Sequence, residues 1–342
     1  MRVFVTGATG FVGSAVVADL IVAGHQVLGL ARSDEAAEKL WAAGAEVHRG
    51  DLEDLDSLRA GAAATDGVIH TGFIHDFARF KDVCDIDGRA IAALGSALAG
   101  TDKPMIVTAG VALLASGRLA TEQDAGPAPS DAYPRMSEHA AASAAAQGAQ
   151  VSVVRLSPSV HGDGDHGFVP MLINIAREKG MSAYIGEGTN RWAAVPRRDA
   201  ASLFRLALEK GIAGANYHCV AEEGIAFRDI AAAIGRGLNL PVVSLSPDKA
   251  ADHFGWFTGF AGLDCPASSA QTGAQLGWQP TRAGLINDLN QGRYFETLSP
   301  APADAVAPNL SPSSKRSTMR PAWSAPSSPE ATERLPMARK RS

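Results

Sequence analysis

Cysteine is scarce in this chain of 342 residues: only Cys84, Cys219 and Cys265 occur, far apart and without a CxxC pair. This spacing argues against a disulfide framework and a structural zinc site, and it favours a reducing compartment. No apolar run approaches the roughly 20 residues of a membrane span, and the chain starts on a strand-like run without a signal-peptide pattern. We therefore expect a cytoplasmic protein with no membrane partner.

Positive charge is also in short supply. The 31 Lys and Arg residues face 36 Asp and Glu residues, and the net charge of −5 argues against nucleic acid as a partner. Residues 299–342 differ from the rest, with 8 of the 19 prolines, 7 of the 31 basic residues and only 3 of the 36 acidic ones. This segment shows no strand or helix periodicity, so residues 298–342 are predicted to form a disordered tail. Its basic end, 338–342, is expected to be solvated.

Strand and helix patterns alternate along the first 160 residues. This rhythm is typical of βαβ units, in which helices cover both faces of a parallel sheet. It predicts an α/β fold with a Rossmann-type doubly wound parallel sheet. The expected strands cover 3–6, 25–32, 45–52, 67–73, 105–110 and 151–156, and the expected helices cover 13–23, a segment around Leu40 and Trp41, 86–99 and 136–147.

A glycine-rich turn follows the first strand and opens the first helix. In this context Gly7 lets the strand turn sharply, Gly10 lets main-chain N–H groups approach a diphosphate, and Gly13 lets the helix pack closely on the strand. The helix N-terminus adds unpaired N–H groups and a positive dipole. We therefore predict a dinucleotide site. The other predicted contacts of this turn are Thr9, Phe11 and Val12.

The end of the second strand bears on the choice between NAD and NADP. NAD-binding proteins usually place Asp or Glu there to bind the ribose 2′-hydroxyl, whereas this chain has Arg32 and Ser33. Both side chains are suited to a 2′-phosphate, so NADP is favoured and NAD is the weaker alternative. Asp34 and Glu35, which come next, are expected to cap the following helix.

A candidate adenine contact follows the third strand. The carboxylate of Asp51 suits the exocyclic amine, and Leu52 would form an apolar wall. Asp51 is equally suited to cap a helix that begins near Leu52, and the two roles are compatible.

The alternation loosens after Ser157. Residues 161–168 are expected to form a loop, and 182–195 resemble a hairpin. We expect residues 1–160, with strands and helices from 190–236, to form the dinucleotide-binding domain. Residues 161–190 and 237–297 would form a smaller, discontinuous C-terminal substrate lobe. The other elements expected in this half are helices at 169–179, 199–209 and 227–236 and a strand at 215–220.

Four segments together resemble the short-chain dehydrogenase/reductase superfamily, in its extended or atypical branch of the NAD-dependent epimerase/dehydratase type. They are VTGATGFVG (5–13), GDLED (50–54), DGVIHTG (66–72) and VVRLSPSVHG (153–162), and the similarity covers roughly residues 1–296. The resemblance implies further cofactor contacts from Thr71 and Gly72, and from Ser157 and Pro158 beside the nicotinamide.

The family uses a Tyr as acid and base, a Lys four residues later that lowers the phenol pKa, an upstream Ser or Thr, and an Asn. Hydride transfer at a carbonyl carbon requires a matched proton transfer at the oxygen. In this chain the Tyr position corresponds to Pro134, and the Lys position to Glu138. The upstream hydroxyl position falls on Ala109 and the Asn position on Asp85, while Ser137 is retained. The usual catalytic set is therefore absent in this alignment.

Three residues are candidate substitutes for that set. Thr108 and Tyr133 each lie one residue before the family position, so they would reach the site only through a strand bulge and a shifted helix start. His161, in the predicted cleft, has a side chain suited to proton transfer near neutral pH. His75 and His166 lie in loops beside it with Asp163 and Asp165, but their spacing is not that of a metal site.

These observations predict an enzyme: an NAD(P)-dependent oxidoreductase or epimerase/dehydratase-like protein, NADP-preferring, acting on a small carbonyl or hydroxyl substrate with a non-standard catalytic set. The loss of Tyr and Lys leaves an alternative, a non-catalytic NADP(H)-binding sensor or regulator. A fold used only for protein interaction has nothing but the tail in its favour. The Ala-rich stretch at 139–146 would permit a homodimer through close helix packing.

Overall fold

A computed structural model describes residues 1–115 and 117–296. The tail predicted at 298–342 lies outside these residues. Within them, no helix is both long and apolar enough to cross a membrane.

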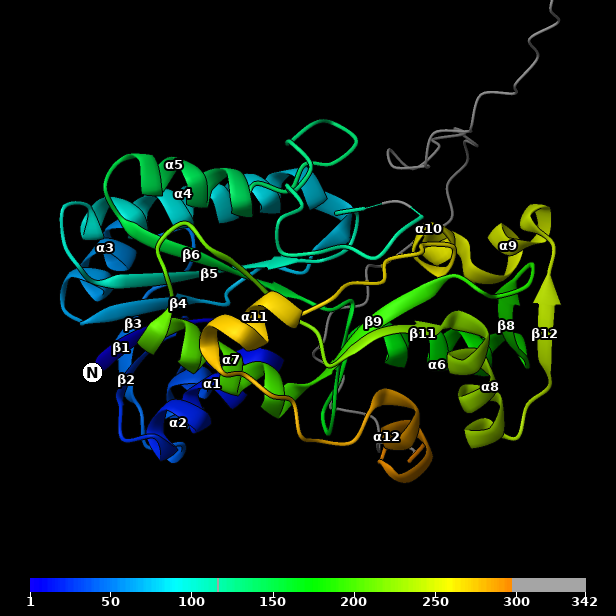
Figure 1. The fold of residues 1–342 in the computed structure, drawn as a ribbon. Helices are drawn as coiled ribbons and strands as arrows, with labels where there is room; N and C mark the ends of the chain where they lie inside the picture. Colours follow the sequence, from blue (N-terminus) through cyan, green and yellow to red (C-terminus); the bar gives the residue numbers. More distant parts are fainter. Residues whose placement is uncertain (116, 297–342) are drawn as a thin grey trace, which may run out of the picture.

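A seven-stranded sheet forms the larger part of the molecule (Figure 1), with the strand order β10-β6-β5-β4-β1-β2-β3 and every neighbouring pair parallel. Its central strands are almost wholly buried apolar runs, as a sheet covered on both faces requires. The predicted α/β doubly wound sheet is confirmed. The strands are β1 (Arg2–Thr6), β2 (Gln26–Ala31), β3 (Glu46–Arg49), β4 (Gly67–His70), β5 (Pro104–Gly110), β6 (Gln150–Leu156) and β10 (Asn216–Cys219).

Helices cover both faces of this sheet (Figure 1). One apolar cluster joins one face to α1 (Phe11–Val22), α2 (Asp34–Ala42) and α7 (Arg197–Lys210). A second cluster joins the other face to α3 (Leu55–Ala63), α4 (Phe80–Leu98) and α5 (Ser137–Ala146). A short helix, η1 (Phe77–Arg79), precedes α4, which begins six residues earlier than predicted.

The remaining elements form a lobe beside the carboxyl ends of the large sheet (Figure 1). Its core contains the buried aromatic rings of Trp192, Phe227, Phe254 and Phe257. Its strands are β7 (Ser159–His161), β8 (Ser182–Ile185), β9 (Arg191–Pro196), β11 (Glu222–Ala226) and β12 (Val242–Leu245), and its helices are α6 (Phe168–Lys179), α8 (Phe227–Leu238), α9 (Pro247–Phe254), η2 (Gly255–Phe257), α10 (Thr258–Ala261) and α12 (Leu285–Gln291). Between α10 and α12, α11 (Ala270–Leu276) returns to the large sheet.

The hairpin predicted at 182–195 is wrong. β8 pairs in parallel with β12, whereas β9 lies between β7 and β11 in a separate sheet. Gly186 and Gly188, both with positive φ, redirect the chain between the two strands. The local sequence marks the turn correctly, but the partners of both strands lie far along the chain.

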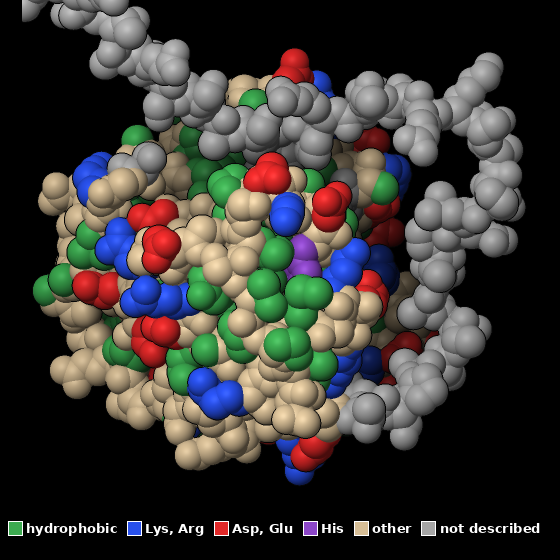
Figure 2. All heavy atoms as spheres, turned by 90° about the vertical axis from the view of Figure 1, so that its right-hand side faces the viewer, with side chains coloured by type: hydrophobic (Ala, Val, Ile, Leu, Met, Phe, Trp, Pro, Cys, Tyr) green, Lys and Arg blue, Asp and Glu red, His purple; other side chains and the backbone are tan. Residues whose placement is uncertain are grey.

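The outer end of the lobe carries charged side chains of both signs, interspersed with hydrophobic ones (Figure 2). This face therefore presents no large field of a single sign among the described residues.

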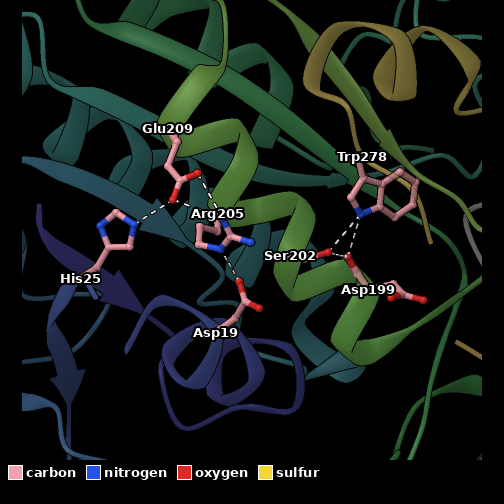
Figure 3. Close-up of polar contacts among 7 residues, drawn as sticks. All are labelled: Asp19, His25, Asp199, Ser202, Arg205, Glu209 and Trp278. Atoms are coloured by element: carbon pink, nitrogen blue, oxygen red, sulfur yellow. Dashed lines mark hydrogen bonds and ion pairs between the residues drawn. The ribbon is translucent and has the colours of Figure 1, made fainter. Parts of the chain in front are cut away.

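Polar contacts fix α7 against α1 (Figure 3). Arg205 donates to Asp19 over 2.7 Å and pairs with Glu209, which also bonds His25 over 2.9 Å. On the other side of α7, the indole N–H of Trp278 donates to the carbonyl oxygen of Asp199 over 3.0 Å. These contacts hold the first residue of α7, Arg197, beside the first turn of α1.

Candidate active site

The glycine turn after β1 is a close crossing of three main-chain segments. Gly7 has φ +65°, and a Cβ there would stand 2.7 Å from the backbone of Thr71 and Gly72. At Gly13 a Cβ would stand 2.0 Å from the carbonyl oxygen of Gly7. The hydroxyl of Thr71 donates to the carbonyl oxygen of Thr6 over 2.8 Å, and the N–H of Gly72 to the Thr6 hydroxyl over 3.2 Å. Only glycine fits at positions 7 and 13.

The N-terminus of α1 opens beside this crossing. Gly10 is the N-cap residue, it is exposed, and no side chain caps the helix. The first turn contains no acidic residue. Thr9, Phe11 and Val12 are partly exposed around it. Free main-chain N–H groups without a competing carboxylate fit the diphosphate of a dinucleotide.

Arg197 adds a cation at this terminus that sequence reasoning missed. Its guanidinium donates to Ser14 Oγ over 3.0 Å and to the Asp163 carbonyl oxygen over 3.1 Å, and it stacks 4.8 Å from the centre of the Phe11 ring. The ring of His166 makes a T-shaped contact with that of Phe11, with the ring centres 5.7 Å apart. Burial lowers the pKa of Arg197, with Arg198 adding to the effect. It remains a cation at neutral pH and suits a phosphate.

The chain leaves β2 at Arg32 and Ser33, and both residues are exposed at the surface. Arg32 has no hydrogen bond or ion pair with the part of the chain that the structure describes. The Ser33 hydroxyl accepts the N–H of Ala36, so Ser33 caps α2. Asp34 and Glu35 start this helix, as predicted, but neither of them caps it. Both lie in its first turn, and Asp34 pairs with Arg49 over 2.6 Å.

The two proposed adenine contacts, Asp51 and Leu52, have different surroundings. Asp51 accepts the N–H groups of Glu53 and Asp54 on one carboxylate oxygen. Helix α3 begins at Leu55 and is capped by Asp54, so the prediction that Asp51 caps a helix near Leu52 is wrong. The Leu52 side chain lies against Gly72, where a Cβ would stand 3.0 Å from it.

The segment after β6 also lies at the carboxyl edge of the sheet. The Ser157 hydroxyl is buried and donates to the Cys219 carbonyl oxygen over 2.8 Å, which ties β6 to β10. Pro158 is partly exposed. The hydroxyl hydrogen of Ser157 is therefore already used within the fold.

A buried chain of hydrogen bonds connects the glycine turn with the start of α5. Ser137 Oγ donates to one oxygen of Asp87 over 2.6 Å, and the other oxygen lies 3.1 Å from His70 Nε2. His70 Nδ1 lies 2.8 Å from the hydroxyl of Thr6, which already accepts the N–H of Gly72. All four side chains are at least 95% buried. Each group is satisfied when Asp87 is ionised and His70 is neutral with its proton on Nε2.

The start of α5 and the end of β5 border a small hollow of about 20 Å³ that opens to solvent. Tyr133 lies there in a short turn closed by two main-chain bonds with Ser130, before α5 begins. Its place needs no shift of the helix. The residues lining the hollow are Ala109, Gly110, Gly126, Pro127, Tyr133, Arg135, Ser137, Glu138 and His139.

Thr108 is placed differently from the prediction. β5 pairs with β6 in an unbroken series through Thr108 and Ala109, so no bulge turns Thr108 into the hollow. Its hydroxyl donates to the carbonyl oxygen of His70 over 2.7 Å, and it does not line the hollow.

Burial raises the pKa of the Tyr133 phenol, while the charge of Arg135 partly opposes this rise.

The position of the family's lysine holds a neutralised acid. Arg155, wholly buried, donates from Nε and Nη2 to the two carboxylate oxygens of Glu138 over 2.8 and 2.7 Å. A third bond from Arg155 reaches the carbonyl oxygen of Asp124. This pair supplies no net charge to lower the pKa of Tyr133.

His161 is buried away from the hollow. Its Nδ1 lies 2.8 Å from Asp288 of α12, and its Nε2 has no hydrogen-bond partner among the described residues. Tyr294 donates to Asp165 close by, over 2.9 Å.

Burial lowers the pKa of His75, with Arg135 adding to the effect. Among the residues that the structure describes, no three His, Cys, Asp or Glu side chains gather as metal ligands.

Sequence reasoning missed Asp87 and His70 as well as Arg197. Asp85 corresponds to the family's Asn and is exposed, whereas Asp87 is buried two residues later. The available signal was periodicity, because Asp87 occupies the same helix face as the apolar Cys84 and Ile91. A charge in such a stripe requires buried partners.

The glycine crossing yields a paired prediction. Gly13→Ala should lower the free energy of unfolding by about 2–3 kcal/mol, because its Cβ overlaps rigid main chain. Gly10 has φ −73° and ψ 174°, which valine adopts readily. A Cβ at Gly10 would stand 3.1 Å from the carbonyl oxygen of Gly7, so Gly10→Val should cost less stability than Gly13→Ala but should bind dinucleotide about 100-fold or more weakly. Urea unfolding and calorimetric titration with NADP and NAD measure the two effects. Unchanged affinity in Gly10→Val would contradict the predicted diphosphate position.

The buried chain yields a second prediction. Asp87→Leu strands the Ser137 hydroxyl and the His70 N–H, so it should cost about 3–5 kcal/mol of unfolding free energy. Asp87→Asn keeps the shape and one acceptor and should cost less. Asp85→Leu on the exposed side of the same helix is the control and should change stability by about 0.5 kcal/mol at most. Equal denaturation midpoints for the two leucine variants would refute a structural role for the chain.

Two known proteins are similar to most of this chain. An uncharacterized protein of Schizosaccharomyces pombe is 52% identical over 297 residues, covering 86% of this chain and all of the relative. The 2-alkyl-3-oxoalkanoate reductase of Stenotrophomonas maltophilia is 30% identical over 63% of this chain and 67% of that protein.

Solved structures share the fold at low identity. A nucleoside-diphosphate-sugar epimerase from Pseudomonas aeruginosa superposes with a TM-score of 0.67 at 18% identity, over 84% of this chain and 95% of that one. The UDP-glucose 4-epimerase of Thermotoga maritima gives 0.66 at 18% identity, over 85% and 96%. Residues 3–220 match the NAD dependent epimerase/dehydratase family. The chain belongs to that family.

Proposed function

We propose that this protein is an NADP-preferring oxidoreductase that reduces a carbonyl group of a small substrate, with Tyr133 as the proton donor. The observation that carries the proposal is that the dinucleotide turn and the Tyr133 hollow share the carboxyl edge of one sheet. β1, β4 and β5 are consecutive neighbours there, and the chain from Ser137 to Thr6 links the two places through four hydrogen-bonded side chains. Ligands of open parallel sheets bind at this edge.

The dinucleotide would lie with its diphosphate at Gly10 and Arg197 and its adenosine end at Arg32. When bound, it supplies the hydride for the reduction. Arg32 is exposed and has no partner among the described residues, and no acidic residue stands at 31–33 to accept a 2′-hydroxyl. These features support NADP over NAD.

Proton donation matches the state of Tyr133. Its phenol is protonated throughout the neutral range, since burial raises a pKa whose ordinary value is about 10. A protonated phenol donates to the oxygen of a carbonyl as that oxygen gains negative charge. Oxidation of an alcohol requires the phenolate, which the missing lysine would have favoured. The site therefore supports reduction better than oxidation.

The name of the Stenotrophomonas relative, a reductase of a 3-oxo acid, agrees with carbonyl reduction.

The pair of Glu138 with Arg155 favours a second candidate, an NADP(H)-binding sensor without redox chemistry. That pair removes the cation from the lysine position. The sensor hypothesis requires tight cofactor binding without turnover, so the same purified protein distinguishes the two.

Tyr133→Phe should lower kcat for carbonyl reduction by about 10²–10⁴-fold, because it removes the proton donor. NADPH affinity should stay unchanged.

In the wild type the reduction rate should stay level from about pH 6 to 9, whereas alcohol oxidation should rise about tenfold per pH unit as the phenolate fraction grows. Stopped-flow absorbance of NADPH follows both directions. Tight NADPH binding without oxidation across a carbonyl panel would favour the sensor.

Arg32→Asp should weaken NADP binding by about 10–100-fold and improve NAD binding, since a carboxylate repels the 2′-phosphate and accepts from the 2′-hydroxyl. Arg228→Asp, an exposed arginine on α8, is the matched control. Calorimetric dissociation constants for both dinucleotides give the ratio. An unaltered ratio in Arg32→Asp would place the 2′-phosphate elsewhere.

A further inference from the structure

Arg135 is a cation in the hollow without an anion. It is half-buried, and its guanidinium stacks 4.1 Å above the Phe73 ring and 5.9 Å from that of Phe80. Over residues 1–115 and 117–296, neither a carboxylate nor a carbonyl oxygen accepts a hydrogen bond from it. Its five N–H donors are thus left for solvent or a ligand.

Among the described residues, the other buried or partly buried arginines, apart from Arg197 at the start of α7, are paired with a carboxylate. Arg155 bonds Glu138, Arg191 bonds Asp264 and Arg205 bonds Asp19. Removing a guanidinium from water is costly unless an anion or full hydrogen bonding compensates it. Arg135 has only the aromatic faces, which offset part of that cost.

The surroundings do not cancel the charge of Arg135. Glu138 also lines the hollow, but its two carboxylate oxygens are taken by Arg155. The charge of Arg135 reaches several neighbours: with burial, it lowers the pKa of His75, and it acts against the burial that raises the pKa of Cys84 to about 11. Among the residues that line the hollow, Arg135 is therefore a charged side chain left without an ion pair, whereas Glu138 is paired.

We propose that Arg135 binds the carboxylate of an oxo-acid substrate, so that the acid and the carbonyl group lie together in the hollow. This inference rests on the proposed reductase function, whose proton donor, Tyr133, stands two residues before Arg135. Stacking on Phe73 holds the guanidinium plane and leaves its edge free for a two-point bond to a carboxylate. A neutral ketone or a sugar would leave this charge unpaired.

The position of Arg135 argues against a cofactor phosphate as its partner. Arg135 packs on Phe80 of α4, on the sheet face covered by α4 and α5. The open N-terminus of α1 and Arg197 belong to the opposite face, with α1 and α7. The diphosphate thus has its own donors, and Arg135 serves the substrate side.

The test compares acids with their neutral esters on the full chain saturated with NADP. The probes are 2-oxobutanoate, 4-oxopentanoate and benzoylformate, each with its methyl ester, and inorganic phosphate. Calorimetry should show at least one acid binding tenfold or more tighter than its ester. Arg135→Gln should remove that preference, and Arg135→Lys should retain part of it. Arg228→Gln is the control and should keep the wild-type preference.

Three results would overturn the proposal: no acid preferred over its ester, a preference that survives in Arg135→Gln, or phosphate bound more tightly than every acid. NADPH binding and the denaturation midpoint of Arg135→Gln report whether the variant is folded. If it is unfolded, Arg135→Lys and Arg135→Met are measured in its place.

Turnover separates this proposal from the reductase function. Acid binding that depends on Arg135 without NADPH oxidation would support the carboxylate site and contradict the reductase. Equal kcat/KM for acids and esters in wild type and Arg135→Gln would support the reductase and overturn the carboxylate site.

Discussion

A single buried carboxylate holds the two halves of the candidate site together. Asp87 lies inside α4, where a charge is stable only with full hydrogen bonding. Ser137 of α5 and His70 of β4 supply that bonding. His70 is also hydrogen-bonded to Thr6 at the end of β1. The start of α5, and with it the hollow, therefore cannot move freely relative to the glycine turn. A polar network of this kind fixes one arrangement of the elements that it joins.

The distribution of charge in the hollow follows from one further pair. Arg155 is wholly buried and must be neutralised, and Glu138 does this with both oxygens. Glu138 thereby becomes unavailable to Arg135, although both line the same space. Glu138, at the position of the family's lysine, thus neutralises the buried Arg155, because buried ions must be paired. As a consequence, Arg135 is a second cation that stays open to ligands.

Much of the fold could be predicted because its signals are local. Buried parallel strands are short apolar runs, as at β1 and β6, and the glycine turn is dictated by backbone geometry. Pairing is not local: β8 pairs with β12, which follows it only after β9, α7, β10, β11 and α8, so the sequence at 182–195 indicates a turn without the partners of its strands. The site divides in the same way. The cofactor turn follows from a contiguous motif, whereas Asp87 and Arg197 acquire meaning only from residues far along the chain.

The absence of the lysine does not by itself decide whether chemistry occurs. The lysine of the family favours the phenolate, which matters when the tyrosine must accept a proton from an alcohol. A phenol that only gives a proton to a carbonyl oxygen needs no such help, because an alkoxide is far more basic than a phenolate. A raised pKa at Tyr133 is compatible with donation and unfavourable to abstraction. The same surroundings hold Arg135 on the Phe73 ring at the hollow, where it would bind the anionic substrate that we propose. In the proposed reductase, loss of the usual set would restrict the direction of the reaction and the charge of the substrate more than it restricts catalysis.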